Sequence, residues 1–241
     1  MRVVTRFWPL LLGACATPVA PEATRASDAC ARALGSDRIE EASAQCDLAL
    51  EYGTADAALW VNRGLVLGRA GKPEGARAAF ERALDANPDS LQAHNNLGVL
   101  DLRSDAPERA IEHFEEALRV DPRFVAARYN LALARHRQGG GAEARRQLRI
   151  ALAVDPGFVP AWRALGALAL EGGDDALAAE AFERASAAAP HDAGTWLGLA
   201  EAEARRGRLE AARTALARCL RADPRRDLCR ARLTALGGAG P

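Results

Sequence analysis

The chain has 241 residues, of which 49% are hydrophobic but only 5% aromatic, and its 32 basic residues balance 32 acidic ones. Alanine and leucine dominate the hydrophobic residues, so the composition favours helices over a sheet, which is usually rich in β-branched and aromatic residues. The formal net charge of zero argues against a protein whose ligand is nucleic acid or an anionic membrane surface, because such proteins usually carry excess positive charge.

Residues 1–14 are typical of an export signal. Arg2 and Arg6 precede an apolar run that ends at residue 14, and this run is too short to span a bilayer, which takes about 20 apolar residues. The sequence Leu-Gly-Ala before Cys15 resembles the lipobox of bacterial lipoproteins, which implies that Cys15 is acylated and becomes the mature N-terminus. The alternative is an ordinary secretory signal that precedes a cysteine by chance.

Residues 15–27 are expected to form a lipidated flexible tether. Small and polar residues dominate here, two prolines are present, and no apolar periodicity is visible. The residue after the cysteine is Ala16 and not an aspartate. By resemblance to enteric lipoproteins this implies the outer membrane, with the folded part facing the periplasm, and the inner membrane is the alternative.

Five prolines divide most of the remaining chain into repeats. They are spaced by 34 residues throughout, at Pro88, Pro122, Pro156, Pro190 and Pro224. With each proline at repeat position 32, position 20 is always alanine, position 8 is glycine or alanine, position 27 is alanine or cysteine, and position 24 is phenylalanine or leucine. The five full repeats are 57–90, 91–124, 125–158, 159–192 and 193–226.

This pattern resembles the tetratricopeptide-repeat (TPR) family. The resemblance implies an all-α fold, a right-handed TPR superhelix or α-α solenoid, in which each repeat is a pair of antiparallel helices. Small residues at positions 8, 20 and 27 suit the places where the two helices approach most closely, and the large residue at position 24 fills the gap between repeats. Position 15, usually glycine, falls in the turn after the first helix, where a positive φ is expected.

The same frame extends to both ends of the array. Residues 23–56 fit a degenerate N-terminal repeat, with alanine at positions 20 and 27, and residues 227–236 fit an amphipathic C-terminal capping helix before a tail at 237–241. Degenerate units are expected at the ends of a solenoid, where one stacking neighbour is missing. The solenoid as a whole is predicted to occupy 28–236.

Four cysteines fall at the two ends of the predicted solenoid. Cys30 and Cys46 occupy positions 8 and 24 of the degenerate repeat, whereas Cys219 lies in the last full repeat and Cys229 in the capping helix. In an oxidising periplasm we predict the disulfides Cys30–Cys46 and Cys219–Cys229. The alternative is that the four cysteines are free and pack as small hydrophobic residues.

The sequence carries no recognisable catalytic or cofactor-binding pattern. Its histidines, His94, His113, His136 and His191, form no metal-binding pair on one helix, and its triple-glycine segment follows no predicted strand. His113 is expected to be solvated. We therefore expect no enzymatic activity, no cofactor, no bound metal and no small-molecule substrate.

A concave groove is the expected functional surface. In a TPR array the first helices line this groove, chiefly through positions 2, 5, 6, 9, 12 and 13. Asparagine recurs at position 6 and arginine at position 13, so we predict amides that pair with a partner's backbone and guanidinium groups that meet its acidic groups. The alternative is that the asparagines bond neighbouring turns and the apolar residues only pack. The predicted groove residues are Val61, Asn62, Leu65, Arg69, Asn95, Asn96, Val99, Arg103, Tyr129, Asn130, Leu133, Arg137 and Arg163.

A lipid-anchored TPR array of this length resembles the pilotins of type IV pilus secretins, the TPR lipoproteins of tight-adherence (Flp) pili and those of gliding-motility machines. The resemblance implies a periplasmic scaffold that binds secretin, pilus or motility proteins and helps to assemble, localise or stabilise their complex. An adaptor that recruits peptidoglycan enzymes to the outer membrane is the alternative function.

Overall fold

The structure, a computed structural model, describes residues 21–53 and 55–237, and within them it contains thirteen helices and no strand. The predicted export signal, Cys15, residues 16–20 of the predicted tether and residues 238–241 of the predicted tail lie outside the described residues. The helices are α1 (Pro21–Gly35), α2 (Ile39–Glu51), α3 (Ala57–Arg69), α4 (Pro73–Ala86), α5 (Leu91–Arg103), α6 (Pro107–Val120), α7 (Val125–Arg137), α8 (Gly141–Val154), α9 (Val159–Glu171), α10 (Asp175–Ala188), α11 (Ala193–Arg205), α12 (Leu209–Ala222) and α13 (Asp227–Ala235).

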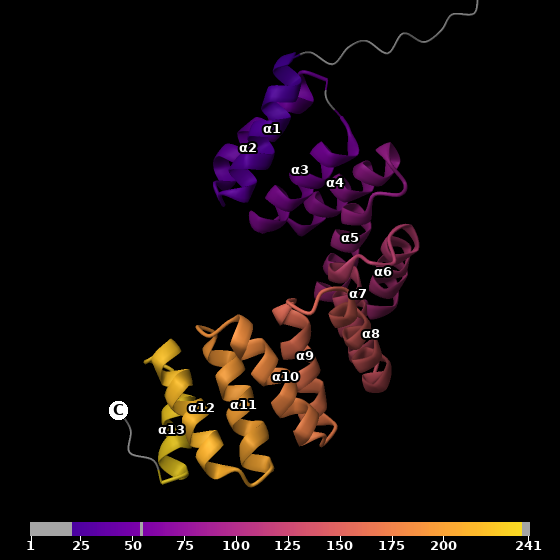
Figure 1. Cartoon of the computed structure of the whole chain (residues 1–241). Helices are drawn as coiled ribbons and strands as arrows, with labels where there is room; N and C mark the ends of the chain where they lie inside the picture. Colours follow the sequence, from indigo (N-terminus) through magenta and orange to yellow (C-terminus); the bar gives the residue numbers. More distant parts are fainter. Residues whose placement is uncertain (1–20, 54, 238–241) are drawn as a thin grey trace, which may run out of the picture.

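Consecutive helices pack as hairpins, from α1 with α2 to α11 with α12, and α13 packs on α12. Each predicted repeat therefore contributes one hairpin, and the predicted all-α array is confirmed. Besides neighbours in the chain, the helices that contact one another most are α1 with α3, α5 with α7 and α9 with α11. All of these are first helices. Because elements on the inner side of a curved stack lie closer together, the first helices form the inner face of the arc in Figure 1, with α6 and α8 on its outer side.

The turns between the two helices of each hairpin have the geometry that the repeat predicts. Position 15 has a positive φ in every full repeat: 71° at Gly71, 56° at Asp105, 83° at Gly139, 75° at Gly173 and 75° at Gly207. Glycine adopts this conformation without a steric penalty, and aspartate is among the few other residues that tolerate it. The expected helix stop is confirmed, including the repeat in which aspartate replaces glycine.

Positions 8 and 24 form the central contact of each hairpin. A Cβ atom added to Gly98 would lie 2.6 Å from Cε1 of Phe114, and one added to Gly64 would lie 2.4 Å from Cε1 of Phe80. Phe114 is fully buried. The identity of position 8 follows that of position 24, because glycine occurs wherever position 24 is phenylalanine and alanine wherever it is leucine. The glycine thus makes room for the ring.

The N-terminal boundary of the solenoid differs from the prediction. Helix α1 begins at Pro21, so the segment 21–27 of the predicted tether is helical, and Ala23 and Ala26 are buried against α2. Ala23, Ala26 and Cys30 recur at helical spacing and share one face. The pattern is weak in the sequence because alanine adds little hydrophobic contrast with its small polar neighbours. The prediction of a solenoid starting at residue 28 is wrong, whereas the degenerate hairpin predicted at 23–56 is present as α1 and α2.

The structure places both predicted cysteine pairs at disulfide distance. Cys30 on α1 pairs with Cys46 on α2, with Cα atoms 5.1 Å apart, and Cys219 on α12 pairs with Cys229 on α13, with Cα atoms 6.4 Å apart. The first pair occupies the positions 8 and 24 at which other hairpins place glycine and phenylalanine. Each crosslink, when formed, is expected to stabilise a terminal unit by about 3 kcal/mol by restricting the unfolded chain.

Candidate functional site

The predicted groove residues all lie on the first helices α3, α5, α7 and α9, and therefore on the inner face. Most of their side chains are partly or fully exposed, but Val61 is buried. Two open hollows occur on this face, which we name the Tyr129 pocket and the Asn62 pocket. Among the described residues, no group of three or more histidine, cysteine, aspartate or glutamate side chains is placed to bind a metal ion.

The Tyr129 pocket lies over α9, between Tyr129 of α7 and Gly194 of α11, and has a volume of about 390 Å³. The Tyr129 ring meets Phe158 edge-on, with ring centroids 5.6 Å apart, and burial raises its pKa, so the phenol is neutral at pH 7 and can donate a hydrogen bond. The Arg163 guanidinium, 51% exposed, forms an ion pair with Asp192 at 3.2 Å. The pocket is lined by Tyr129, Pro160, Arg163, Ala164, Ala167, Phe182 and Gly194.

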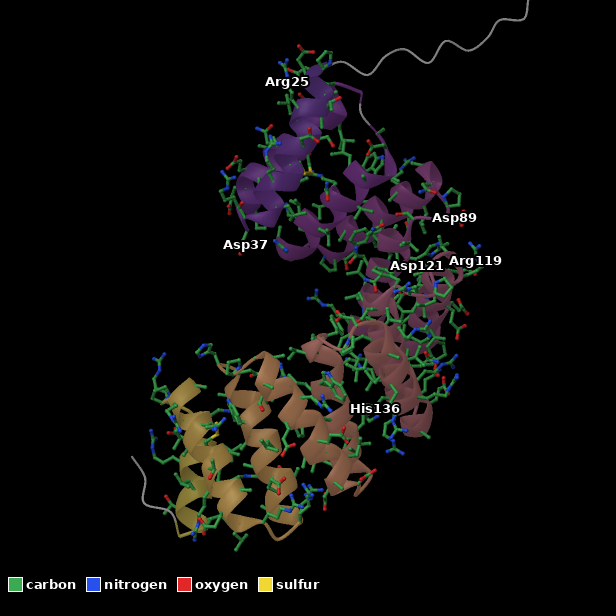
Figure 2. The ribbon with its side chains drawn as sticks, in the orientation of Figure 1. Arg25, Asp37, Asp89, Arg119, Asp121 and His136 are labelled. Carbon is green, nitrogen blue, oxygen red and sulfur yellow. A yellow bond between two sulfur atoms is a disulfide. The ribbon has the colours of Figure 1, made fainter. Side chains whose placement is uncertain are left out.

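The Asn62 pocket lies between α3 and α5 near their N-terminal ends and has a volume of about 490 Å³. Asp89, at its edge, accepts a hydrogen bond from Arg119 of α6 at 2.8 Å, and Figure 2 shows these two side chains side by side. The bond ties the turn between α4 and α5 to the next hairpin. The pocket is lined by the apolar residues Ala57, Ala58, Val61, Leu91 and Val120 and the polar residues Asn62, Asn87, Asp89, Ser90 and Gln92.

The arginine ladder at position 13 has a role that the sequence did not indicate. Arg69 donates to the carbonyl of Leu34 at 3.0 Å, Arg137 donates to that of Leu102, and Arg205 donates to that of Leu170 at 2.9 Å. In each case the acceptor is a carbonyl near the end of the first helix of the preceding repeat. We predicted that Arg69 and Arg137 bind acidic groups of a partner. In the structure they form hydrogen bonds between neighbouring repeats instead.

The asparagine ladder at position 6 is divided between two roles. Asn130 donates its amide to Asn95 at 2.9 Å, so these two predicted groove residues bond across neighbouring repeats, as the alternative interpretation proposed. Asn62 lines the Asn62 pocket. The residues that create the Tyr129 pocket by being small, Ala164, Ala167 and Gly194, were not predicted. The available signal was the change to small residues at groove positions of the fourth and fifth repeats.

A buried ionic cluster lies on the second-helix side of the array. Asp101, fully buried on α5, accepts a hydrogen bond from Arg77 at 2.7 Å and lies 3.5 Å from Arg109 and 3.6 Å from Nε2 of His113. The prediction that His113 is solvated is wrong, because only 26% of its side chain is exposed. Burial lowers the pKa of His113, against the raising effect of Asp101. This cluster is separate from both inner pockets.

Comparison with protein families gives matches over most of the array. One tetratricopeptide-repeat model matches residues 54–123, and a second matches residues 101–169 and 169–236. A search of curated protein sequences finds no match. Within the described residues, no helix is both long and apolar enough to cross a membrane.

Several solved structures share the fold. PilF of Pseudomonas aeruginosa superposes with a TM-score of 0.77 at 16% identity, covering 89% of this chain and 97% of that protein. PilW, described as a widely conserved type IV pilus biogenesis factor, gives a TM-score of 0.78 at 22% identity, covering 88% of this chain and 98% of PilW. YrrB, described as a TPR protein with an unusual peptide-binding site, gives a TM-score of 0.60 at 20% identity, covering 78% of this chain and 97% of YrrB.

Proposed function

Because the chain belongs to the tetratricopeptide-repeat family, we propose that it is a non-enzymatic, lipid-anchored periplasmic scaffold that binds a partner protein on its inner face and helps to assemble or stabilise a type IV pilus complex. The observation that carries the binding role is the pair of open pockets on the inner face. Between them they offer an aromatic ring, a half-exposed guanidinium, side-chain amides and apolar walls. Such groups recognise a polypeptide through anchored side chains and backbone hydrogen bonds.

The extent of the structural likeness supports the choice of machine. This chain matches PilF and PilW along nearly their whole lengths, and PilW is described as a type IV pilus biogenesis factor. The lipobox-like motif that ends at Cys15 supports an anchor in the outer membrane, which would hold the array in the periplasm.

The binding proposal is tested by affinity capture from the native host. The tagged full chain is recovered from membranes in mild detergent, and co-purifying proteins are quantified by mass spectrometry. We expect a secretin or another pilus component, and we expect Tyr129→Ala combined with Arg163→Gln to lower its recovery by about ten-fold or more, as loss of interface anchors does. Arg149→Gln, at an exposed residue of α8, is the matched control and should leave recovery unchanged.

The same capture separates the proposed function from its rivals. Recovery of amidases or endopeptidases in place of pilus components would support the adaptor that recruits peptidoglycan enzymes. Recovery of cytoplasmic proteins alone, from the correctly processed protein, would contradict both envelope functions. Equal recovery by the double variant and by the Arg149 control would show that the partner binds elsewhere than in the Tyr129 pocket.

The anchor makes a separate prediction. Cys15→Ser removes the only thiol that the lipobox offers for acylation, so the protein should move from the membrane pellet to the soluble periplasmic fraction. The reason is that stable anchoring depends on buried acyl chains, while no described helix can substitute for them. Fractionation followed by immunoblotting measures this, with Cys219→Ser as the control cysteine. Membrane association that survives Cys15→Ser would refute the lipid anchor.

A further inference from the structure

A third pocket lies on the outer face of the array, away from both inner pockets. It has a volume of about 560 Å³ and lies between the second helices α10 and α12, with α11 as its floor. We name it the outer pocket. Its walls include Glu183 and Ala187 on one side and Ala211 and Ala215 on the other, and its floor includes Leu199 and Glu203. It is therefore a largely apolar hollow with carboxylates on its lining.

Glu203 is the unusual residue of the outer pocket. Its side chain is only 3% exposed, and a buried carboxylate needs hydrogen-bond donors to offset the loss of water. Oε1 accepts a hydrogen bond from Arg206 at 2.8 Å. Oε2 is buried without any hydrogen bond, and the nearest cation, Nε of Arg208, lies 3.8 Å away. One oxygen of this carboxylate thus lacks a donor.

The internal repeat offers one comparison, because one other full repeat has a carboxylate at this position. Asp101 occupies the same repeat position as Glu203, three repeats earlier, and it lies 2.7, 3.5 and 3.6 Å from Arg77, Arg109 and His113. Its Oδ2 also accepts no hydrogen bond, so the two carboxylates differ in the cationic side chains around them. Asp101 has three, all from second helices, whereas Glu203 has Arg206 and Arg208 from the turn that follows its own helix. The residues at the three corresponding places around Glu203 are Ala179, Ala211 and Ala215. Two of these alanines line the outer pocket. The pocket therefore occupies the space that cationic side chains fill around Asp101.

We propose that the outer pocket binds an arginine side chain presented by a partner protein, which takes the place of the cations that the array supplies at Asp101. The aliphatic stem packs on Leu199 and Ala215, and the guanidinium donates a hydrogen bond to Oε2 of Glu203. Glu183 adds negative charge at the same pocket. Arg218 is the one basic residue in the lining. Its guanidinium lies over the Trp196 ring, 4.9 Å from the centroid, and Arg218 is two helical turns from Ala211, so it does not supply the cation at the Ala211 end of the pocket.

The open shape favours a side chain on a polypeptide over a free small molecule. A second hollow, lined by His191 and Arg221, shares Trp196 and Arg218 with the outer pocket. A chain that inserts its arginine beside Glu203 can therefore continue towards a basic region. The inference rests on the proposed function only in that a partner protein presents the arginine, and the binding of an arginine probe is measurable without that partner.

The first test is a titration of the mature, full-length protein with N-acetyl-arginine methylamide, followed through the indole N–H signal of Trp196 in NMR spectra. The signal is assigned by its loss in Trp196→Phe. N-acetyl-citrulline methylamide, which has nearly the same shape without the charge, is the control probe. We expect a saturable shift with the arginine probe, and binding about ten-fold weaker or more for the citrulline probe or for Glu203→Gln, because a charged hydrogen bond is lost. Absence of a shift, or equal shifts with both probes, would overturn the proposal.

The second test fills the pocket from within. Ala211→Arg places an arginine beside Glu203 at the repeat position that Arg109 occupies beside Asp101. It should therefore raise the unfolding temperature by about 3 °C and abolish binding of the arginine probe. In a Glu203→Gln background the increase should disappear. Ala211→Leu, which fills space without charge, should block the probe without any stabilisation that depends on Glu203. An Ala211→Arg effect that is the same with glutamate and glutamine at 203 would overturn the proposal, whereas failure of partner capture through Tyr129 would not affect it.

Discussion

Gly98→Ala should destabilise the protein by about 1–3 kcal/mol, although glycine to alanine inside a helix normally stabilises by up to about 1 kcal/mol. The added Cβ would lie 2.6 Å from the Phe114 ring, closer than carbon atoms pack, and the ring is fully buried and cannot swing into solvent. The free energy of unfolding from urea titration measures the effect.

Gly68→Ala is the matched control on a neighbouring first helix. An added Cβ at Gly68 would meet only Cβ of Ala76, at an ordinary distance of 3.9 Å, so here the helix-propensity effect should dominate and the variant should be more stable. Opposite signs for these two glycines would show that packing, rather than backbone preference, fixes glycine at position 8. Stabilisation by both substitutions would contradict this explanation.

The pairing of positions 8 and 24 makes the prediction sharper. The third and fifth full repeats combine alanine with leucine, at Ala132 with Leu148 and at Ala200 with Leu216. All four residues are buried, so an alanine at position 8 packs well when position 24 is leucine. Phe114→Leu should therefore be destabilising alone, through the cavity that it leaves, yet it should relieve much of the Gly98→Ala defect. A double-mutant cycle measures this coupling, and strictly additive effects would count against it.

The sequence predicted the repeat frame well because the frame depends on a few positions that are constrained in every repeat. The prolines, the small residues at positions 8, 20 and 27, and the turn residue at position 15 are visible without any long-range information. The frame also predicted which cysteines would meet. The start of α1 was missed because its buried face consists mostly of alanine, including Ala23 and Ala26, and alanine gives little periodic signal.

Contacts between repeats were harder to predict because chemically different residues make the same bond. Position 4 is tryptophan, histidine or arginine, yet Trp162 and Trp196 each donate to the carbonyl of the preceding repeat proline at 2.8 Å, and Arg128 donates to Pro122 O in the same way. His94 places Nε2 3.0 Å from Pro88 O. In each of these four repeats, a side-chain nitrogen of position 4 lies within hydrogen-bond distance of the proline carbonyl. Because three residue types supply this nitrogen, the contact is not visible as a recurring residue in the sequence.

Candidate sites were only partly predictable for a related reason. Tyr129, Arg163 and Asn62 could be assigned to the inner face from their repeat positions, and they do line pockets there. Arg69 and Arg137 have the same kind of position but bond to the preceding repeat. The outer pocket exists because Ala211 and Ala215 are small where Arg109 and His113 stand three repeats earlier. This difference becomes meaningful only when the structure shows what Arg109 and His113 contact.

The second large effect is expected at Asp101, where one carboxylate holds together two hairpins. Asp101→Asn keeps the shape of the side chain but removes the charge that faces Arg77 at 2.7 Å and Arg109 at 3.5 Å. Arg77 belongs to α4 and Arg109 to α6, so two guanidinium groups from different repeats would then face each other without a counter-charge. Removing one partner of a fully buried ion pair typically destabilises by about 3–5 kcal/mol. Because Arg77 keeps 26% and Arg109 62% of its side chain exposed, water compensates part of this, and we expect a loss of about 2–3 kcal/mol.

Asp85→Asn is the control for charge loss alone, because Asp85 pairs with Arg82 at 3.8 Å with both side chains more than two-thirds exposed, and exposed pairs contribute about 0–1 kcal/mol. Urea unfolding of both variants gives the comparison. If the large loss arises from uncompensated cations, Arg77→Met should recover part of the stability of Asp101→Asn, because it removes one of the two charges left behind. An Asp101→Asn effect as small as that of Asp85→Asn would show that this cluster does not join the repeats, and it would also remove the reason for expecting a cation beside Glu203.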